Sequence, residues 1–221
     1  MRFLTSDTLG SKLAGKTVLA PAVRELFSLN LVYVVAALLL VPIVVHALVA
    51  TVRRERYGAS IQKGKNTWRW TGVAIKSSLM LIILALLAGM TDVASLLLLT
   101  AVATSVFVCG LAVEAYDVYK PASSRVAAVL GVAAAAVALL GVGLYLLASA
   151  VFGSASVPGY LWLLFGLTAA WFASMIANTH LVNSKVGKWA NYIYGEVWHL
   201  ALSFVATTVF VWVVFIAVLK P

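Results

Sequence analysis

The chain has 221 residues, of which 63% are hydrophobic and 10% are charged, with 16 Lys and Arg against 7 Asp and Glu. A soluble domain carries about 25% charged residues, so this composition excludes a soluble enzyme, an acidic binding module and a disordered chain. A membrane protein with several spans remains, and at about 20 apolar residues per span the chain has room for roughly six or seven helices.

Residues 1–26 precede the first long apolar run, and we expect them to form an extracellular N-terminal segment. They contain no continuous apolar core and no small-residue cleavage pattern, so no signal peptide is predicted. Residues 10–17 fit the G-x-x-x-x-G-K-[ST] pattern of nucleotide-binding P-loops. That site needs a strand, a helix and a whole α/β domain, for which this segment is too short. We therefore interpret the match as chance.

Residues 27–221 contain six apolar runs that are long enough to cross a bilayer, at 27–52, 68–90, 93–116, 125–152, 159–183 and 192–219. Their apolar residues do not alternate at every second position, as the strands of a membrane β-barrel do. The predicted fold class is therefore all-α, a polytopic bundle of six transmembrane helices. Several aromatic residues mark the ends of the runs as an interfacial belt, namely Trp68, Trp70, Trp189, Tyr192 and Tyr194.

The loops between the runs fall into two charge classes. Lys and Arg lie in the loops at 53–67, 117–125 and 184–191, whereas the other two loops contain none. The positive-inside rule then places these three loops in the cytoplasm and the C-terminus outside. We expect a multi-pass protein of the cell membrane whose first partner is the lipid bilayer. Because the basic residues are dispersed among loops, no nucleic-acid partner is predicted.

Polar side chains within the spans are candidate site residues, because ionisable groups are costly there. Lys76 lies near the middle of its span, with no Asp or Glu at its depth. It is either a lysine in a polar cavity bonded to Ser or Thr, or a neutral amine that forms a Schiff base. His46 either bridges two helices or belongs to a site. The hydroxyls of Ser203 and Thr207 can each bond to a carbonyl one turn back.

Small residues gather in the fourth run, where they allow helices to approach closely. The face serves packing within the bundle or forms a homodimer; its members are Gly131, 133–136, Gly141 and Gly143. Cys109 lies in an apolar run and is interpreted as packing. The three histidines are dispersed and no catalytic or metal-binding motif is present, so neither enzyme activity nor a metal site is predicted.

Several segments in order along the chain resemble the heliorhodopsin family. The run KVGKWANYIYGEVWHLALSFVATTVFVWVVF, residues 185–215, is similar to the last helix of that family and the loop before it. His46 begins a segment similar to the family's second helix. Further matches are Arg69-Trp70, residues 77–80, Gly89, Asp92, residues 94–96, Gly110-Leu111 and Glu114.

The resemblance implies a seven-helix retinal protein with its N-terminus in the cytoplasm. The six runs would then be helices two to seven. Residues 1–7 resemble the end of the family's first helix, so that helix is either lost or encoded upstream of Met1. A helix starting inside would also explain an outside segment at 1–26 without a signal peptide.

Departures from the family concern its chromophore. The retinal-binding lysine falls on Thr207, the counterion glutamate on Gly72, and a pocket asparagine on Ala103. Ser203 and His46 match family residues. Lys76 is new and lies one helical turn from Gly72, on the same face. The candidate pocket residues are therefore Lys76, Ser203, Thr207, Gly72 and His46.

The leading hypothesis is a heliorhodopsin-like membrane protein that does not bind retinal covalently and acts in signalling, through a cytoplasmic protein partner, or as a scaffold. One alternative is a photoreceptor whose Schiff base has moved to Lys76; another is an ion channel or transporter. Accordingly, either no cofactor is expected, or retinal held non-covalently or through Lys76.

Overall fold

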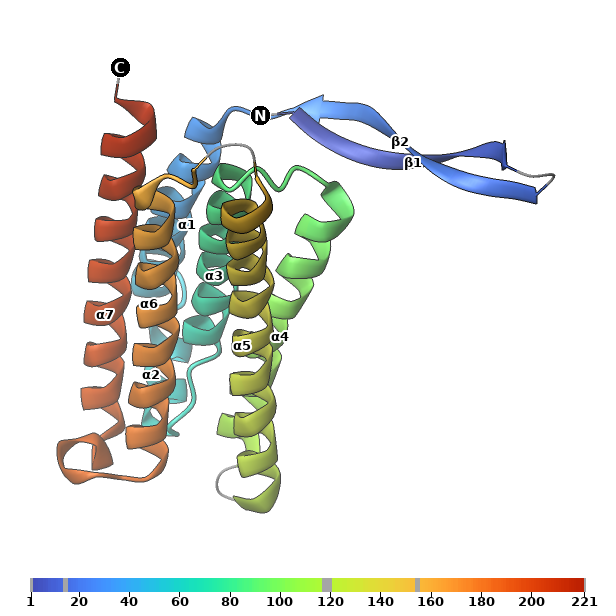
Figure 1. Ribbon diagram of the computed structural model, residues 1–221. Helices are drawn as coiled ribbons and strands as arrows, with labels where there is room; N and C mark the ends of the chain where they lie inside the picture. The colour runs from blue at the N-terminus through green and yellow to red at the C-terminus, as the bar shows by residue number, and fades with distance from the viewer. Residues whose placement is uncertain (1, 14–15, 117–120, 154–155, 221) are drawn as a thin grey trace.

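The computed structural model describes residues 2–13, 16–116, 121–153 and 156–220. Six long helices form a bundle (Figure 1): α1 (Leu31–Thr51), α3 (Thr67–Leu87), α4 (Val93–Tyr116), α5 (Pro121–Phe152), α6 (Gly159–Asn183) and α7 (Tyr192–Val214), which continues as the π-helical turn η2 (Phe215–Leu219). Within the described residues, six helices are long and apolar enough to span a membrane. The predicted helical membrane bundle is confirmed.

Polar side chains define where several helices begin. Asn30 accepts a hydrogen bond from the Val32 amide, Asn66 from the Arg69 amide and Asn191 from the Ile193 amide, each at 3.0 Å. Asp92 caps α4 by accepting from the Ser95 amide at 2.7 Å, and this bond lowers the pKa of its exposed carboxyl. Such caps satisfy amides that have no partner within the helix.

An antiparallel hairpin precedes the bundle, made of β1 (Arg2–Leu13) and β2 (Lys16–Ser28). Sequence reasoning missed it. Residues 2–7, expected to resemble the end of a helix, lie in a strand, because pairing with β2 satisfies their backbone groups without a helix. The P-loop-like residues straddle the two strands, with Leu13 opposite Lys16, so no loop-to-helix transition follows them.

A short helix, α2 (Arg54–Gln62), lies in the stretch expected to be loop. Figure 1 places α2 and the 3-10 turn η1 (Gly187–Ala190) at one end of the bundle, and the hairpin and the C-terminus at the other. We call the first end the basic end. Among the residues that the structure describes, its exposed cations are Arg53, Arg54, Arg56, Lys63, Lys65, Arg125, Lys185 and Lys188. Its cytoplasmic location stays a prediction.

Helix α3 is the central helix of the bundle. Its apolar stretch is 67% buried, against 17–33% for the other five spans. Met80, Leu81 and Leu84 of α3 are fully buried in one cluster with Leu38 of α1 and Phe210 of α7. This cluster closes the half of the bundle that faces the hairpin with apolar side chains.

Small residues bring helices into contact within the chain. A Cβ added at Gly131 of α5 would lie 3.0 Å from the Cβ of Cys109 in α4, and one at Gly143 would lie 3.0 Å from the Phe165 ring in α6. Part of the small-residue face therefore packs inside the bundle. A homodimer through the remainder stays a prediction.

Gly110 permits the closest approach between α3 and α4. A Cβ at this position would lie 2.2 Å from the Trp70 ring, so Gly110→Ala forces the indole or the helix to move. We expect this substitution to lower the free energy of unfolding by about 1–3 kcal/mol, as overpacked cores do. Thermal unfolding in detergent measures it. Gly141→Ala is the matched control because no atom lies within 4 Å of its added Cβ; equal melting temperatures for the two variants would contradict the packing argument.

Candidate functional site

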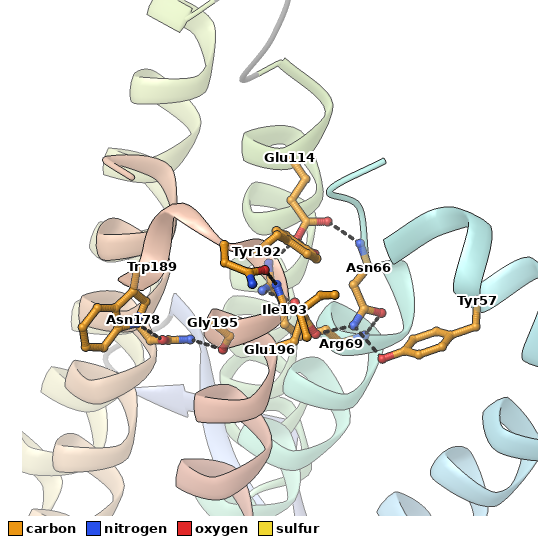
Figure 2. Close-up of polar contacts among 11 residues, drawn as sticks. Tyr57, Asn66, Arg69, Glu114, Asn178, Trp189, Tyr192, Ile193, Gly195 and Glu196 are labelled. Carbon is orange, nitrogen blue, oxygen red and sulfur yellow. Dashed lines mark hydrogen bonds and ion pairs between the residues drawn. The ribbon is translucent and has the colours of Figure 1, made fainter. Parts of the chain in front are cut away.

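Arg69 is the centre of a buried ion-pair cluster near the basic end. It lies in the first turn of α3, and its side chain is 4% exposed. One terminal nitrogen pairs with Glu196 of α7 at 2.5 Å, and the other pairs with Glu114 of α4. Figure 2 shows these groups converging from three helices. Because a guanidinium offers a planar fork of donors, one arginine joins two carboxylates and three helices.

Neighbouring polar groups complete the coordination of both carboxylates. The backbone N–H of Asn66 donates to Glu114 at 2.9 Å, and the side-chain Nδ2 of Asn66 donates to Glu196 at 2.6 Å. The Tyr192 hydroxyl donates to Glu114 at 3.0 Å. Tyr57 of α2 lies beside Asn66, and burial, followed by the charge of Glu196, raises the pKa of its phenol. With one cation and two anions, the cluster has a formal charge of −1.

A second polar contact fixes the turn between α6 and α7. Asn178 of α6 donates to the Gly195 carbonyl at 3.0 Å and accepts from the Trp189 indole at 2.9 Å. Gly195 is required there, because a Cβ would lie 2.2 Å from Val182. This contact, also drawn in Figure 2, holds the first turn of α7, and therefore Glu196, in register with α6.

Four of the five predicted pocket residues line one cavity of about 60 Å³, which we call the lysine cavity. Gly72 and Lys76 reach it from α3, His46 from α1 and Ser203 from α7. Arg69, Tyr57, Glu196 and His199 line it toward the basic end. A water needs roughly 10–15 Å³ and ligand pockets measure about 300–1,000 Å³, so the lysine cavity suits a few water-sized groups.

Lys76 crosses from α3 to α7. Its ammonium donates to the Ser203 carbonyl at 3.1 Å and to the Ser203 hydroxyl. Thr207, which does not line the cavity, donates to the same carbonyl at 2.8 Å. This geometry fits the interpretation of a buried lysine bonded to Ser. His46 is exposed, and its Nδ1 lies 2.6 Å from the Pro42 carbonyl one turn back.

A larger apolar pocket of about 200 Å³ lies among α3, α4, α5 and α6. We call it the tryptophan pocket, because the Trp70 and Trp171 indoles line it. Both indole N–H groups are buried and, within the described residues, lack a hydrogen-bond partner. Phe172, Met175 and Gly110 complete its wall, and no residue lines both this pocket and the lysine cavity.

Sequence reasoning missed the tryptophan pocket. Trp70 was expected in an interfacial belt, but its side chain is buried against Gly110. Its position along the helix fitted an interface, whereas the rotation of α3 directs it inward. Ala103, at the expected place of a pocket asparagine, is buried in the core and lines neither pocket.

Comparison with known families gives one finding that covers nearly the whole chain. The heliorhodopsin family model matches residues 3–219. The chain therefore belongs to the heliorhodopsin family. A search of curated proteins found no match.

Removal of the cation tests the cluster. Arg69→Met leaves two buried carboxylates facing each other, and we expect the free energy of unfolding to fall by about 3–5 kcal/mol. Adding Glu114→Gln and Glu196→Gln should recover most of this loss, because the two buried carboxylates that repel each other are then neutral amides. Thermal unfolding of the wild-type protein and the two variants measures both effects.

The matched control is Arg125→Met, which removes an exposed arginine at the same end. A surface change of this kind should alter stability by less than about 0.5 kcal/mol. If Arg69→Met and Arg125→Met lower the free energy of unfolding by the same amount, the cluster does not stabilise the bundle.

Proposed function

We propose that this heliorhodopsin is a membrane receptor that holds a small apolar ligand non-covalently in the tryptophan pocket. The observation that carries the proposal is that two tryptophans line an apolar pocket while their buried indole N–H groups have no hydrogen-bond partner within the described residues. Leaving a buried donor unsatisfied costs about 1–3 kcal/mol. A ligand with an apolar body and an oxygen acceptor would remove that cost while filling the space.

Retinoids are the first candidates because the family binds retinal. The residues do not fit covalent attachment in this pocket, because no lysine is among the described residues that line it. Lys76 supplies the one buried amine of the described spans, but it opens on the separate lysine cavity. At about 200 Å³, the tryptophan pocket would enclose one ring or a short chain, with the rest of the ligand extending between helices.

Trp70 is the residue that would couple ligand binding in the tryptophan pocket to the ion-pair cluster near the basic end. Its ring centroid lies 4.8 Å from the Arg69 guanidinium, and the same ring packs on Gly110. A ligand that displaces the indole would therefore move the group on which Glu114 and Glu196 converge. A change there would alter the ends of α3, α4 and α7, where a cytoplasmic protein partner could respond.

The alternative with specific support is a photoreceptor with a Schiff base on Lys76. A buried amine bonded only to Ser203 favours it. The size of the lysine cavity, about 60 Å³, weighs against it, because a polyene would have to displace α1 or α7. Conduction has less support, since fully buried apolar residues close the half of the bundle toward the hairpin.

All-trans retinol tests the receptor proposal because it has an oxygen acceptor but no aldehyde. We expect saturable energy transfer from tryptophan to retinol in the purified protein. Ala128→Phe, which fills the tryptophan pocket, should weaken binding about tenfold or more, equivalent to at least 1.4 kcal/mol. Ala133→Phe on the exposed face of the same helix is the matched control and should bind as wild type. Equal affinity of all three proteins would reject the pocket.

Trapping with all-trans retinal and borohydride separates the alternatives. The receptor proposal expects no visible band sensitive to hydroxylamine and no retinyl adduct in the peptide that contains Lys76. An adduct that disappears in Lys76→Ala would instead establish the photoreceptor.

A further inference from the structure

A hollow at the basic end lies outside both internal pockets. It has a volume of about 430 Å³ and is lined by six consecutive residues, 51–56, where α1 ends and α2 begins. Arg53, Arg54 and Arg56 are exposed there, and none of the three makes an ion pair or a side-chain hydrogen bond within the described chain. Three arginines thus line one concave surface together with Glu55, and the local formal charge is +2.

The chemistry of these side chains selects a phosphate. A guanidinium presents a planar fork that pairs with two oxygens of a phosphate, whereas an ammonium acts as a point charge. Along the basic end, arginine is concentrated at this hollow, while lysine occupies the loops at 63–65 and 185–188. A role in membrane orientation alone would not require this concentration of arginine, because the positive-inside rule treats Lys and Arg alike.

The position of the hollow indicates where that phosphate comes from. It lies directly beyond Thr51, the last residue of the α1 span, which is the depth of lipid headgroups. Interfacial aromatic residues mark the same end: the Trp189 ring contacts Tyr194 at 5.1 Å and Trp198 at 6.4 Å. Trp198 is 42% exposed. A juxtamembrane group of basic residues at this level attracts anionic lipids.

We propose that Arg53, Arg54 and Arg56 form a binding site for the phosphodiester of an anionic phospholipid in the leaflet at the basic end. The site is independent of the tryptophan pocket and of the receptor proposal. Its occupant would hold α2 against the membrane surface, beside Tyr57 and Asn66, which contact the ion-pair cluster.

The experiment compares lipid retention in nanodiscs of phosphatidylcholine with and without phosphatidylglycerol, measured by native mass spectrometry. The wild-type protein should retain phosphatidylglycerol. In Arg53→Gln/Arg54→Gln/Arg56→Gln, the amount of retained lipid should fall by a factor of about ten or more. The matched control is Lys63→Gln/Lys65→Gln/Lys188→Gln, which removes the same charge from the same end and should stay within about twofold of wild type. Circular dichroism verifies that each variant is folded.

Two further arms distinguish the source and the geometry of the phosphate. Arg53→Lys/Arg54→Lys/Arg56→Lys keeps the charge but removes the forks, and it should lose most of the retention. Glycerol 3-phosphate added to phosphatidylcholine nanodiscs should not bind measurably. Equal losses in the two glutamine variants would show diffuse surface attraction and overturn the site. Binding of glycerol 3-phosphate as tight as that of the lipid would assign a soluble ligand instead.

Discussion

The bridging of Glu114 and Glu196 by the Arg69 guanidinium is the constraint on which the arrangement of the bundle depends. A charge within a membrane protein is costly unless it is paired, and here one cation satisfies carboxylates from two other helices. The pairing fixes the rotation of α3 about its axis. With that rotation set, Trp70 faces the tryptophan pocket on one side, while Gly72 and Lys76 face the lysine cavity on the other.

Covalent retinal binding would need a large apolar volume and an amine in the same place, and this rotation of α3 separates the two. The larger apolar volume lies among α3 to α6, whereas the amine opens on a cavity of about 60 Å³ between α3, α1 and α7. The resemblance in sequence predicts Thr207 and Gly72 at the positions of the family's lysine and counterion. Loss of one member alone would leave an uncompensated buried charge, which costs about 3–5 kcal/mol. Joint replacement of the pair by neutral residues would be the less costly change.

Hydropathy predicted the spans well because a membrane helix is a local property of about 20 residues. Single capping residues such as Asn66 and Asp92 mark where helices begin, but the span limits were predicted from hydropathy alone. The hairpin was missed because its strands are defined by pairing with each other rather than by an apolar run. Glu114, Glu196 and Arg69 could each be placed at the end of a span. Their convergence depends on how each helix is rotated about its axis, and so does the inward direction of Trp70. These helices are apolar on nearly all sides, so the hydropathy of the sequence does not reveal that rotation.

Charge balance explains why a lysine without an adjacent carboxylate is compatible with the centre of the bundle. Arg69 and Lys76 together match Glu114 and Glu196, so these four groups are formally neutral. Seven residues separate the two cations on α3, a rise of about 10 Å. At an effective dielectric constant of about 20, attraction between Lys76 and the surplus negative charge over that distance is roughly 1.5–2 kcal/mol. This attraction offsets only part of the free-energy cost of burying the Lys76 ammonium. The hydrogen bonds from the ammonium to the two oxygens of Ser203 offset a further part of that cost. Lys76 therefore belongs electrostatically to the Arg69 cluster, although its side chain contacts neither carboxylate. The lysine cavity is better understood as an extension of that cluster than as a remnant of a chromophore site.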